Sequence, residues 1–171
     1  FLSKLTPQQV ESLKKSQVQQ CPFCLIAQGK IKSYKIYEDD YRIAVLDINP
    51  ATEGHIILFT KNHYRYSFDM SENESKEFFN LANNIARELV KITKAAGVNI
   101  YLPNGESAGQ KTDHFILHLI PRYKNDGLNF NWNPRKLSED RLQSMTKKLS
   151  NLNLSKEIKQ NKVEKNFIFK K

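Results

Sequence analysis

The sequence lacks the features of a membrane protein and of a disulfide-rich secreted domain. It has two cysteines in 171 residues, too few for a disulfide framework. No apolar run approaches the roughly 18 residues of a membrane-spanning helix, and no signal-peptide pattern stands at the start. We therefore expect a cytoplasmic protein with no membrane segment.

The composition is that of an ordinary globular protein with a basic end. Hydrophobic residues make up 39% of the chain and aromatic residues 11%, enough for the core of one domain. The formal net charge is +9, and residues 143–171 hold eight lysines against two glutamates. This end is either a solvated surface or a contact for RNA, DNA or an acidic protein, and Phe167 to Phe169 are a candidate anchor for it.

Strand and helix signals alternate along the chain. Short strands are expected at residues 35–38, 42–46, 54–59, 98–102 and 114–120. Thr6, Pro7 and Gln9 mark a helix start, and this first helix should run to about Gln19.

Two further helices follow from capping signals. Ser71 and Glu74 form a capping box that opens a long amphipathic helix, which we expect to end at Gly97. Ser138 begins a last helix, with Leu142, Met145 and Leu149 predicted to face inward. The order indicates an α+β domain with a mainly antiparallel sheet. We divide the chain into an N-terminal helix (1–19), the main domain (20–136) and a basic, helical C-terminal extension (137–171).

The two cysteines form the motif Cys21-Pro22-Phe23-Cys24. In an intracellular chain this spacing indicates half of a zinc site or a redox pair. The redox interpretation requires a helix start directly after a strand, whereas a polar helical stretch precedes this motif. We favour zinc, which needs two more ligands.

The segment from Asn104 to Arg122 reads NGESAGQKTDHFILHLIPR. Because side chains alternate across a strand, His114, Ile116 and His118 should share one face. Phe115, Leu117 and Leu119 should face a core on the other side. The preceding loop, with two glycines, can expose N–H groups to an anion, although a plain hairpin loop would look similar.

The same segment resembles the active-site strand of the histidine-triad (HIT) family of nucleotide-binding proteins. The family signature is His-φ-His-φ-His-φ-φ, where φ is apolar, and it falls here on His114, Ile116 and His118. The resemblance implies a HIT-like fold, a purine nucleotide or nucleotide-like ligand, and a homodimer. In that family the middle histidine is the nucleophile, and here it is isoleucine.

A second segment, from Leu46 to His63, resembles the other half of the family's pocket. The resemblance places Asp47 and Ile48 at the ribose and base, and His55 behind the nucleophile. It assigns His118 to the phosphate. The remaining nucleotide-binding candidates lie in the loop: Asn104, Gly109 and Gln110, with Lys111 beside them.

The metal ligands of the zinc-bearing branch of the family also have counterparts in this sequence. Its pattern matches Cys21, Cys24, His63 and His114, a Cys₂His₂ set that suits a closed tetrahedral structural site. Zinc bound there would tie the N-terminal helix to the sheet.

Two departures affect the chemistry. Isoleucine has no lone pair with which Ile116 could attack phosphorus. Pro103 stands where family enzymes commonly have an asparagine, and it offers neither a side-chain donor nor an N–H. An engineered origin of Ile116 is an alternative, although the usual choices for an engineered knockout are Ala, Gly or Asn.

The sequence therefore predicts a zinc-stabilised nucleotide-binding protein whose catalysis is absent or weak. One alternative is an active nucleotide hydrolase or nucleotidyl transferase that uses His118 or water. The other is an interaction module that binds nucleic acid or a protein through its basic end.

Overall fold

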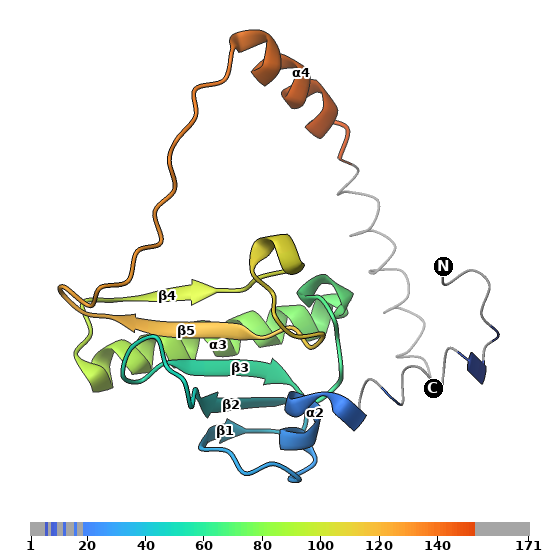
Figure 1. Ribbon diagram of the computed structural model, residues 1–171, viewed down its shortest axis with the longest axis vertical. Helices are drawn as coiled ribbons and strands as arrows, with labels where there is room; N and C mark the ends of the chain where they lie inside the picture. The colour runs from blue at the N-terminus through green and yellow to red at the C-terminus, as the bar shows by residue number, and fades with distance from the viewer. Residues whose placement is uncertain (1–5, 7, 10–11, 13–15, 17–18, 153–171) are drawn as a thin grey trace, which may run out of the picture. The chain divides into compact units, whose positions relative to one another are not determined.

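The computed structural model describes residues 6, 8, 9, 12, 16 and 19–152. The chain divides into two compact units, residues 1–128 and 129–171. The elements of the first unit, drawn in Figure 1, are α2 (Pro22–Ala27), β1 (Lys35–Glu38), β2 (Arg42–Leu46), β3 (Ile56–Thr60), η2 (Ser67–Asp69), α3 (Glu72–Thr93), β4 (Gly97–Tyr101), η3 (Glu106–Ala108) and β5 (Leu117–Arg122). The second unit holds α4 (Glu139–Leu149). No described helix combines the length and apolar character needed to cross a bilayer.

The strands form one sheet in the order β1-β2-β3-β5-β4, with every neighbouring pair antiparallel. The α+β class with a mainly antiparallel sheet is therefore confirmed. β5 runs between β3 and β4, so His118 lies opposite Ile57 on one neighbour and Tyr101 on the other. This register sets which side chains surround the histidine.

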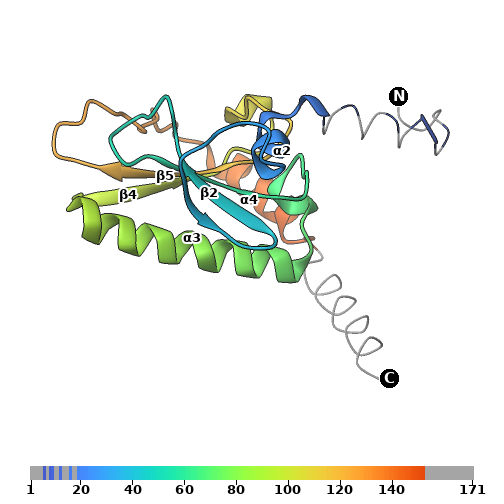
Figure 2. The same ribbon diagram turned by 90° about the horizontal axis from the view of Figure 1, so that it is seen from below.

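The two faces of the sheet are covered by different helices (Figure 2). On one face, Phe78 and Ala82 of α3 pack with Phe115, Leu117 and Leu119, all at most 1% exposed. On the other face, a second apolar cluster includes Cys21 and Cys24, Phe23, Ile43, Val45, Ile57 and Phe59, with Ile116 packed against it. The predicted alternation of residues 114–119 between the two faces is confirmed.

The long helix begins where the sequence predicts and ends earlier. The Ser71 hydroxyl accepts from the Glu74 N–H, and the Glu74 carboxylate accepts from the Ser71 N–H, as a capping box requires. The predicted end at Gly97 is wrong. α3 ends at Thr93, Lys94 takes the left-handed conformation with φ 56°, and Gly97 opens β4.

The strand carrying His118 is shorter than predicted. β5 begins at Leu117, because the backbone N–H of Phe115 donates instead to Tyr64 in the segment after β3, at 2.9 Å. This contact brings residue 114 beside the chain that carries His63. The expected strand start at His114 is therefore corrected by three residues.

The ends of the chain are described only in part. Thr6 and Gln9 exchange backbone-to-side-chain hydrogen bonds of 2.8 and 3.3 Å, as the predicted helix start requires. Leu142, Met145 and Leu149 of α4 are 52, 51 and 53% exposed among the described residues, and their predicted inward orientation stays a prediction. The lysines from 156 onward and Phe167 to Phe169 lie outside the described residues. The boundaries at 19/20 and 136/137 stay predictions.

Candidate functional site

Two cysteines and two histidines converge beneath the start of α2. Cys21 is the N-cap of that helix and Cys24 lies in its first turn. His63 follows β3, and His114 precedes β5. The Cys24 Sγ atom lies 3.2 Å from Nδ1 of His63 and 3.6 Å from Nδ1 of His114, and Cys21 Sγ lies 3.5 Å from the same His114 atom. Four donor atoms from three segments thus meet within 4.8 Å of one another.

This donor set fits a tetrahedral zinc ion. Zinc–sulfur and zinc–nitrogen bonds of about 2.3 and 2.05 Å imply sulfur–nitrogen edges of about 3.5 Å in a regular tetrahedron. The three observed sulfur–nitrogen distances span 3.2–3.6 Å. Two soft thiols and two imidazoles are also the ligand types of structural zinc sites. The four residues can therefore hold the metal with little rearrangement.

Burial shifts the pKa of two of these side chains toward their neutral forms. Burial, followed by a hydrogen bond with Cys21, raises the pKa of the Cys24 thiol to about 12. Burial, followed by the neighbouring His63, lowers the pKa of His114 to about 4. The cysteines are free rather than disulfide-bonded. Binding of a divalent cation would release thiol protons, because the thiolate is the ligand.

A second group of titratable side chains lies on the same face, centred on two histidines. His55 Nε2 is 3.0 Å from His118 Nδ1, and Asp47 Oδ2 is 3.4 Å from His55 Nδ1. Burial is the main cause that lowers the pKa of both histidines, to about 4 for His118. Both imidazoles are consequently neutral at pH 7.

The ribose and base candidates lie at the rim of this group. The Oδ1 atom of Asp47 accepts the Asn49 N–H at 2.8 Å, which fixes the carboxylate at the end of β2. Ile48 is 76% exposed, so its side chain is available to an incoming ligand. The structure therefore brings Asp47, His55 and His118 together, and Ile48 follows Asp47 directly in the chain.

Ile116, which stands between His114 and His118, is an apolar residue in apolar surroundings. Ile116 packs against the cluster that contains Cys21, Phe23 and Phe59. Pro103 is buried where β4 leads into the glycine loop. Neither residue brings a polar side-chain group between the two clusters.

The loop from Gly105 to Gln110 is held by its own hydrogen bonds. The Gln110 amide nitrogen donates to the carbonyls of Arg65 and Thr112, and its oxygen accepts the Gly105 N–H. Asn104 pairs with both the N–H and the hydroxyl of Ser67. These two amide side chains are thus engaged in shaping the loop, and a direct ligand contact from them stays a prediction.

Position 109 requires glycine, because the side chain of Tyr101 lies too close for a Cβ atom. Its φ is +94°, and a Cβ there would lie 2.5 Å from the Tyr101 hydroxyl, which donates to the Ala108 carbonyl at 2.7 Å. The same tyrosine ring lies 5.9 Å from the His118 ring, between centroids. Tyr101 therefore connects the loop to the histidine, a link the sequence did not reveal because it depends on the β4–β5 register.

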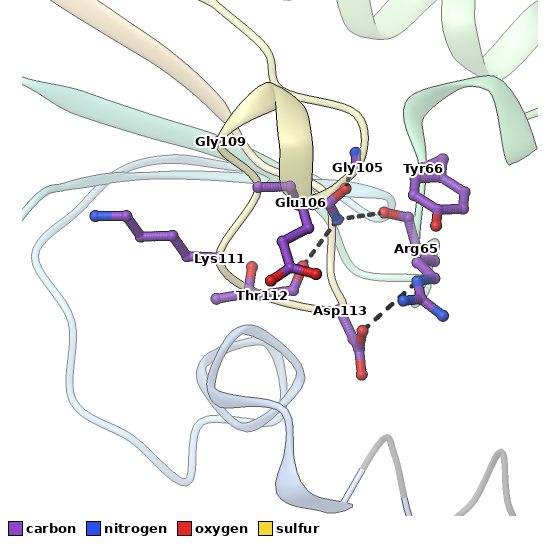
Figure 3. Close-up of a pocket in the computed structure, with 9 residues that line it drawn as sticks. Arg65, Tyr66, Gly105, Glu106, Gly109, Lys111, Thr112 and Asp113 are labelled. Atoms are coloured by element: carbon purple, nitrogen blue, oxygen red, sulfur yellow. Dashed lines mark hydrogen bonds and ion pairs between the residues drawn. The ribbon is translucent and has the colours of Figure 1, made fainter.

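A hollow of about 590 Å³ opens beside this loop, within the size range of small-molecule sites. It is lined by Arg65, Tyr66, the loop, and residues 110–113. Figure 3 shows the ion pair of Arg65 with Asp113 on one side and Lys111 extending away from it. Asp47, His55 and His118 do not line this hollow, but the charge of Lys111 contributes to the lowered pKa of His118. Lys111 therefore both lines the hollow and acts electrostatically on His118.

Comparison with known proteins identifies the family of the chain. The HIT domain model matches residues 28–125. The chain is 39% identical over 112 residues to an uncharacterised HIT-like protein of Borreliella burgdorferi, which covers 64% of this chain and 81% of that protein. It is 36% identical over 130 residues to an adenosine 5'-monophosphoramidase of Saccharomyces cerevisiae, covering 75% of this chain and 80% of that protein.

Solved structures show the same likeness. A HIT family member from Bacillus subtilis superimposes with a TM-score of 0.72 at 32% identity, covering 78% of this chain and 96% of that one. A zinc-bound histidine triad family protein from Mycobacterium smegmatis gives a TM-score of 0.61 at 32% identity, covering 69% of this chain and 86% of that one.

Proposed function

Because this chain belongs to the HIT family, we propose that it is a zinc-stabilised nucleotide-binding protein whose nucleotidyl-transfer chemistry is absent or weak. One observation carries the proposal. The Asp47–His55–His118 group is connected by contacts of 3.0 and 3.4 Å, while the residue between His114 and His118 is an isoleucine packed among apolar side chains.

Each pocket residue has a chemical part in the proposal. Asp47 accepts hydrogen bonds from ribose hydroxyls, and the exposed side chain of Ile48 lies against a purine base. His118 contacts the phosphate, and Lys111 adds positive charge on the loop side. Gly109 and Gln110 hold the loop in shape. None of these side chains supplies the nucleophile that a covalent nucleotidyl-imidazole intermediate needs.

Zinc has a structural part in the proposal. Cys21, Cys24, His63 and His114 would hold it, and a bound Zn²⁺ would cross-link α2 to the segments flanking β3 and β5. All four protein donors are used, so no coordination position is left for a substrate. The zinc-bound relative from Mycobacterium smegmatis supports this assignment.

The proposal is tested by measuring binding and turnover on one preparation. Calorimetry with adenosine 5'-monophosphate should give a saturable Kd, which Asp47→Ala weakens about tenfold through lost ribose contacts. Hydrolysis of adenosine 5'-phosphoramidate by the same sample should stay near background. A sample that does not bind the nucleotide, or that turns the phosphoramidate over rapidly, contradicts the proposal.

The second candidate is an active phosphoramidase. It is favoured by the yeast relative, which is named for that activity. In this case water or His118 would replace the missing nucleophile. Rapid phosphoramidate turnover that His118→Ala abolishes would establish it over the first candidate.

The third candidate is an interaction role for the basic extension, favoured by the eight lysines of residues 143–171. Lysines that meet phosphates give binding that falls steeply with salt and shows little sequence preference. The two members in α4, Lys147 and Lys148, lie in its last turn.

A homodimer and a cytoplasmic location complete the proposal. β4 is an edge strand of the sheet, and Ile100 on it and Ile92 on α3 are 44 and 79% exposed. Pairing through these elements would cover both side chains. Sedimentation of the wild type beside Ile92→Glu would detect such a dimer as a difference in mass.

A further inference from the structure

His55 is held by a backbone group that decides where its proton lies. The N–H of Ala51 donates to His55 Nδ1 at 3.1 Å. A neutral imidazole has one donor nitrogen and one acceptor nitrogen. Since Nδ1 accepts this bond, the proton of neutral His55 must lie on Nε2.

Asp47 is the competing influence on the same nitrogen. Its Oδ2 atom lies 3.4 Å from His55 Nδ1 and would favour a proton there. The contact is longer than the Ala51 bond, and Asp47 already accepts the Asn49 N–H. A proton on Nδ1 of a neutral ring would also point at the Ala51 N–H, which would then lose its acceptor. The Ala51 bond therefore decides the tautomer.

The proton arrangement passes from His55 to His118. His55 Nε2 lies 3.0 Å from His118 Nδ1, so a proton on the first atom makes the second an acceptor. The proton of neutral His118 must then lie on its Nε2. Among the described residues this atom has no hydrogen-bond partner, and it is not one of their buried unpartnered polar atoms, so it is open to a ligand.

We infer that Ala51 and His55 are positioning residues that lock His118 in one tautomer, with Nε2–H presented to the pocket as a neutral hydrogen-bond donor. The inference rests on the proposed function, because it specifies how that site meets its ligand. A locked donor matches an unprotonated phosphate-type oxygen. It offers no lone pair toward the pocket, so His118 does not replace the nucleophile lost at Ile116.

The same tautomer also disfavours metal binding at the second cluster. Asp47, His55 and His118 lie close enough to share an ion. A metal between the two rings would need lone pairs on both facing nitrogens, and one of them carries the hydrogen-bonding proton. The lock thus predicts that no metal binds at this cluster.

The test is nitrogen-15 NMR of histidine-labelled, zinc-loaded protein, in which the ring signals distinguish the two tautomers. We expect His55 and His118 both protonated on Nε2. His55→Leu removes the donor to His118, which should then show mixed tautomers and about tenfold weaker binding of adenosine 5'-monophosphate, a change of about 1.4 kcal/mol. His55→Gln restores an amide donor at similar reach and should recover both the tautomer and most of the affinity, which a purely structural role would not require.

The outcomes separate this inference from the proposed function. A wild-type His118 protonated on Nδ1, or a second zinc lost on His55→Leu, overturns the lock even if nucleotide binds. The predicted tautomers in a protein that binds no nucleotide support the lock and overturn the proposed function. Equal spectra and affinities for the Leu and Gln variants would also overturn the lock.

Discussion

The chain carries two histidine clusters on one face of its sheet, and they differ in completeness. The cluster of Cys21, Cys24, His63 and His114 has every donor that a tetrahedral metal site needs, all within 4.8 Å. The cluster of Asp47, His55 and His118 is connected by contacts of 3.0 and 3.4 Å, but position 116, which the proposed function assigns to the lost nucleophile, is an isoleucine. Under the proposed function, the fold retains a metal cross-link and ligand contacts while the position that performs chemistry has changed.

The physical demands on the two clusters explain the contrast. Loss of one zinc ligand would leave buried thiols and imidazoles without a partner, which costs stability. Isoleucine at position 116 costs little stability, because its side chain packs against an existing apolar cluster. Under the proposed function, the metal site is tied to folding, whereas the nucleophile position is tied only to catalysis.

The largest expected effect is at the metal cluster. Cys24→Ser removes one of two thiolate ligands and should lower stability by roughly 4 kcal/mol, or about 10 °C in Tm for a chain of this size. Metal analysis should find about one zinc per wild-type chain and much less in the variant. Ile116→Val, a small change beside the same cluster, is the control and should keep its zinc. Equal zinc content in wild type and Cys24→Ser would break the comparison.

The next effect concerns the pocket and should leave the fold unchanged. Ile48 is 76% exposed and Ile36, on β1, is 47% exposed. Ile48→Ala should weaken adenosine 5'-monophosphate binding by roughly 1 kcal/mol, about fivefold, through lost apolar contact with the base. Ile36→Ala, the control at an exposed isoleucine with no assigned role, should bind normally. If calorimetry finds both variants equally affected, Ile48 is not a base contact.

The lowered pKa values of the pocket histidines should make the free energy of unfolding depend on pH. Burial lowers the pKa of His118 from 6.5 to about 4 and lowers that of His55. Between those two pH values the unfolded chain binds more protons than the folded one, so the free energy of unfolding falls as pH is lowered through that window. His118→Gln should make this decline shallower in urea denaturation. Parallel declines in wild type and variant would show that His118 is not held neutral by the fold.

Much of this architecture follows from local sequence signals. The capping box at Ser71 and the alternation of residues 114–119 depend on neighbours in sequence, and both predictions are confirmed. The end of α3 escaped prediction because Lys94 adopts a left-handed conformation that usually favours glycine. The predicted C-terminal glycine, Gly97, lies three residues beyond the actual C-cap, Lys94.

The site shows the same division. The four metal-binding candidates were recognised from the family pattern, since cysteine and histidine are themselves the usual zinc ligands. Three site contacts did not follow from the sequence: the Ala51 bond to His55, the Tyr101 contact with His118, and the closed hydrogen bonding of Gln110. They depend on turn geometry and on strand register, which join residues far apart in the chain.

The smallest expected effect is at the basic extension, which belongs to neither cluster. Charge reversal at Lys156, Lys159, Lys162 and Lys165 should abolish weak, salt-sensitive RNA or DNA binding and leave the Tm unchanged. Phe167→Ala with Phe169→Ala, which leaves the charge intact, is the comparison variant. If nucleic acid does not bind at low salt, or binds equally to the charge-reversed protein, the lysines form only a solvated surface.

The contrast between the clusters is tested most directly by nucleotide binding and turnover measured together on zinc-loaded wild type. Ile116→His combined with Pro103→Asn, which restores the two missing family residues, serves as the positive control for chemistry. The account predicts that adenosine 5'-monophosphate binds with a Kd of about 10 μM to 1 mM, while phosphoramidate hydrolysis stays near background and no nucleotide becomes covalently attached. Robust hydrolysis by the wild type, with a trapped covalent nucleotide, would contradict it.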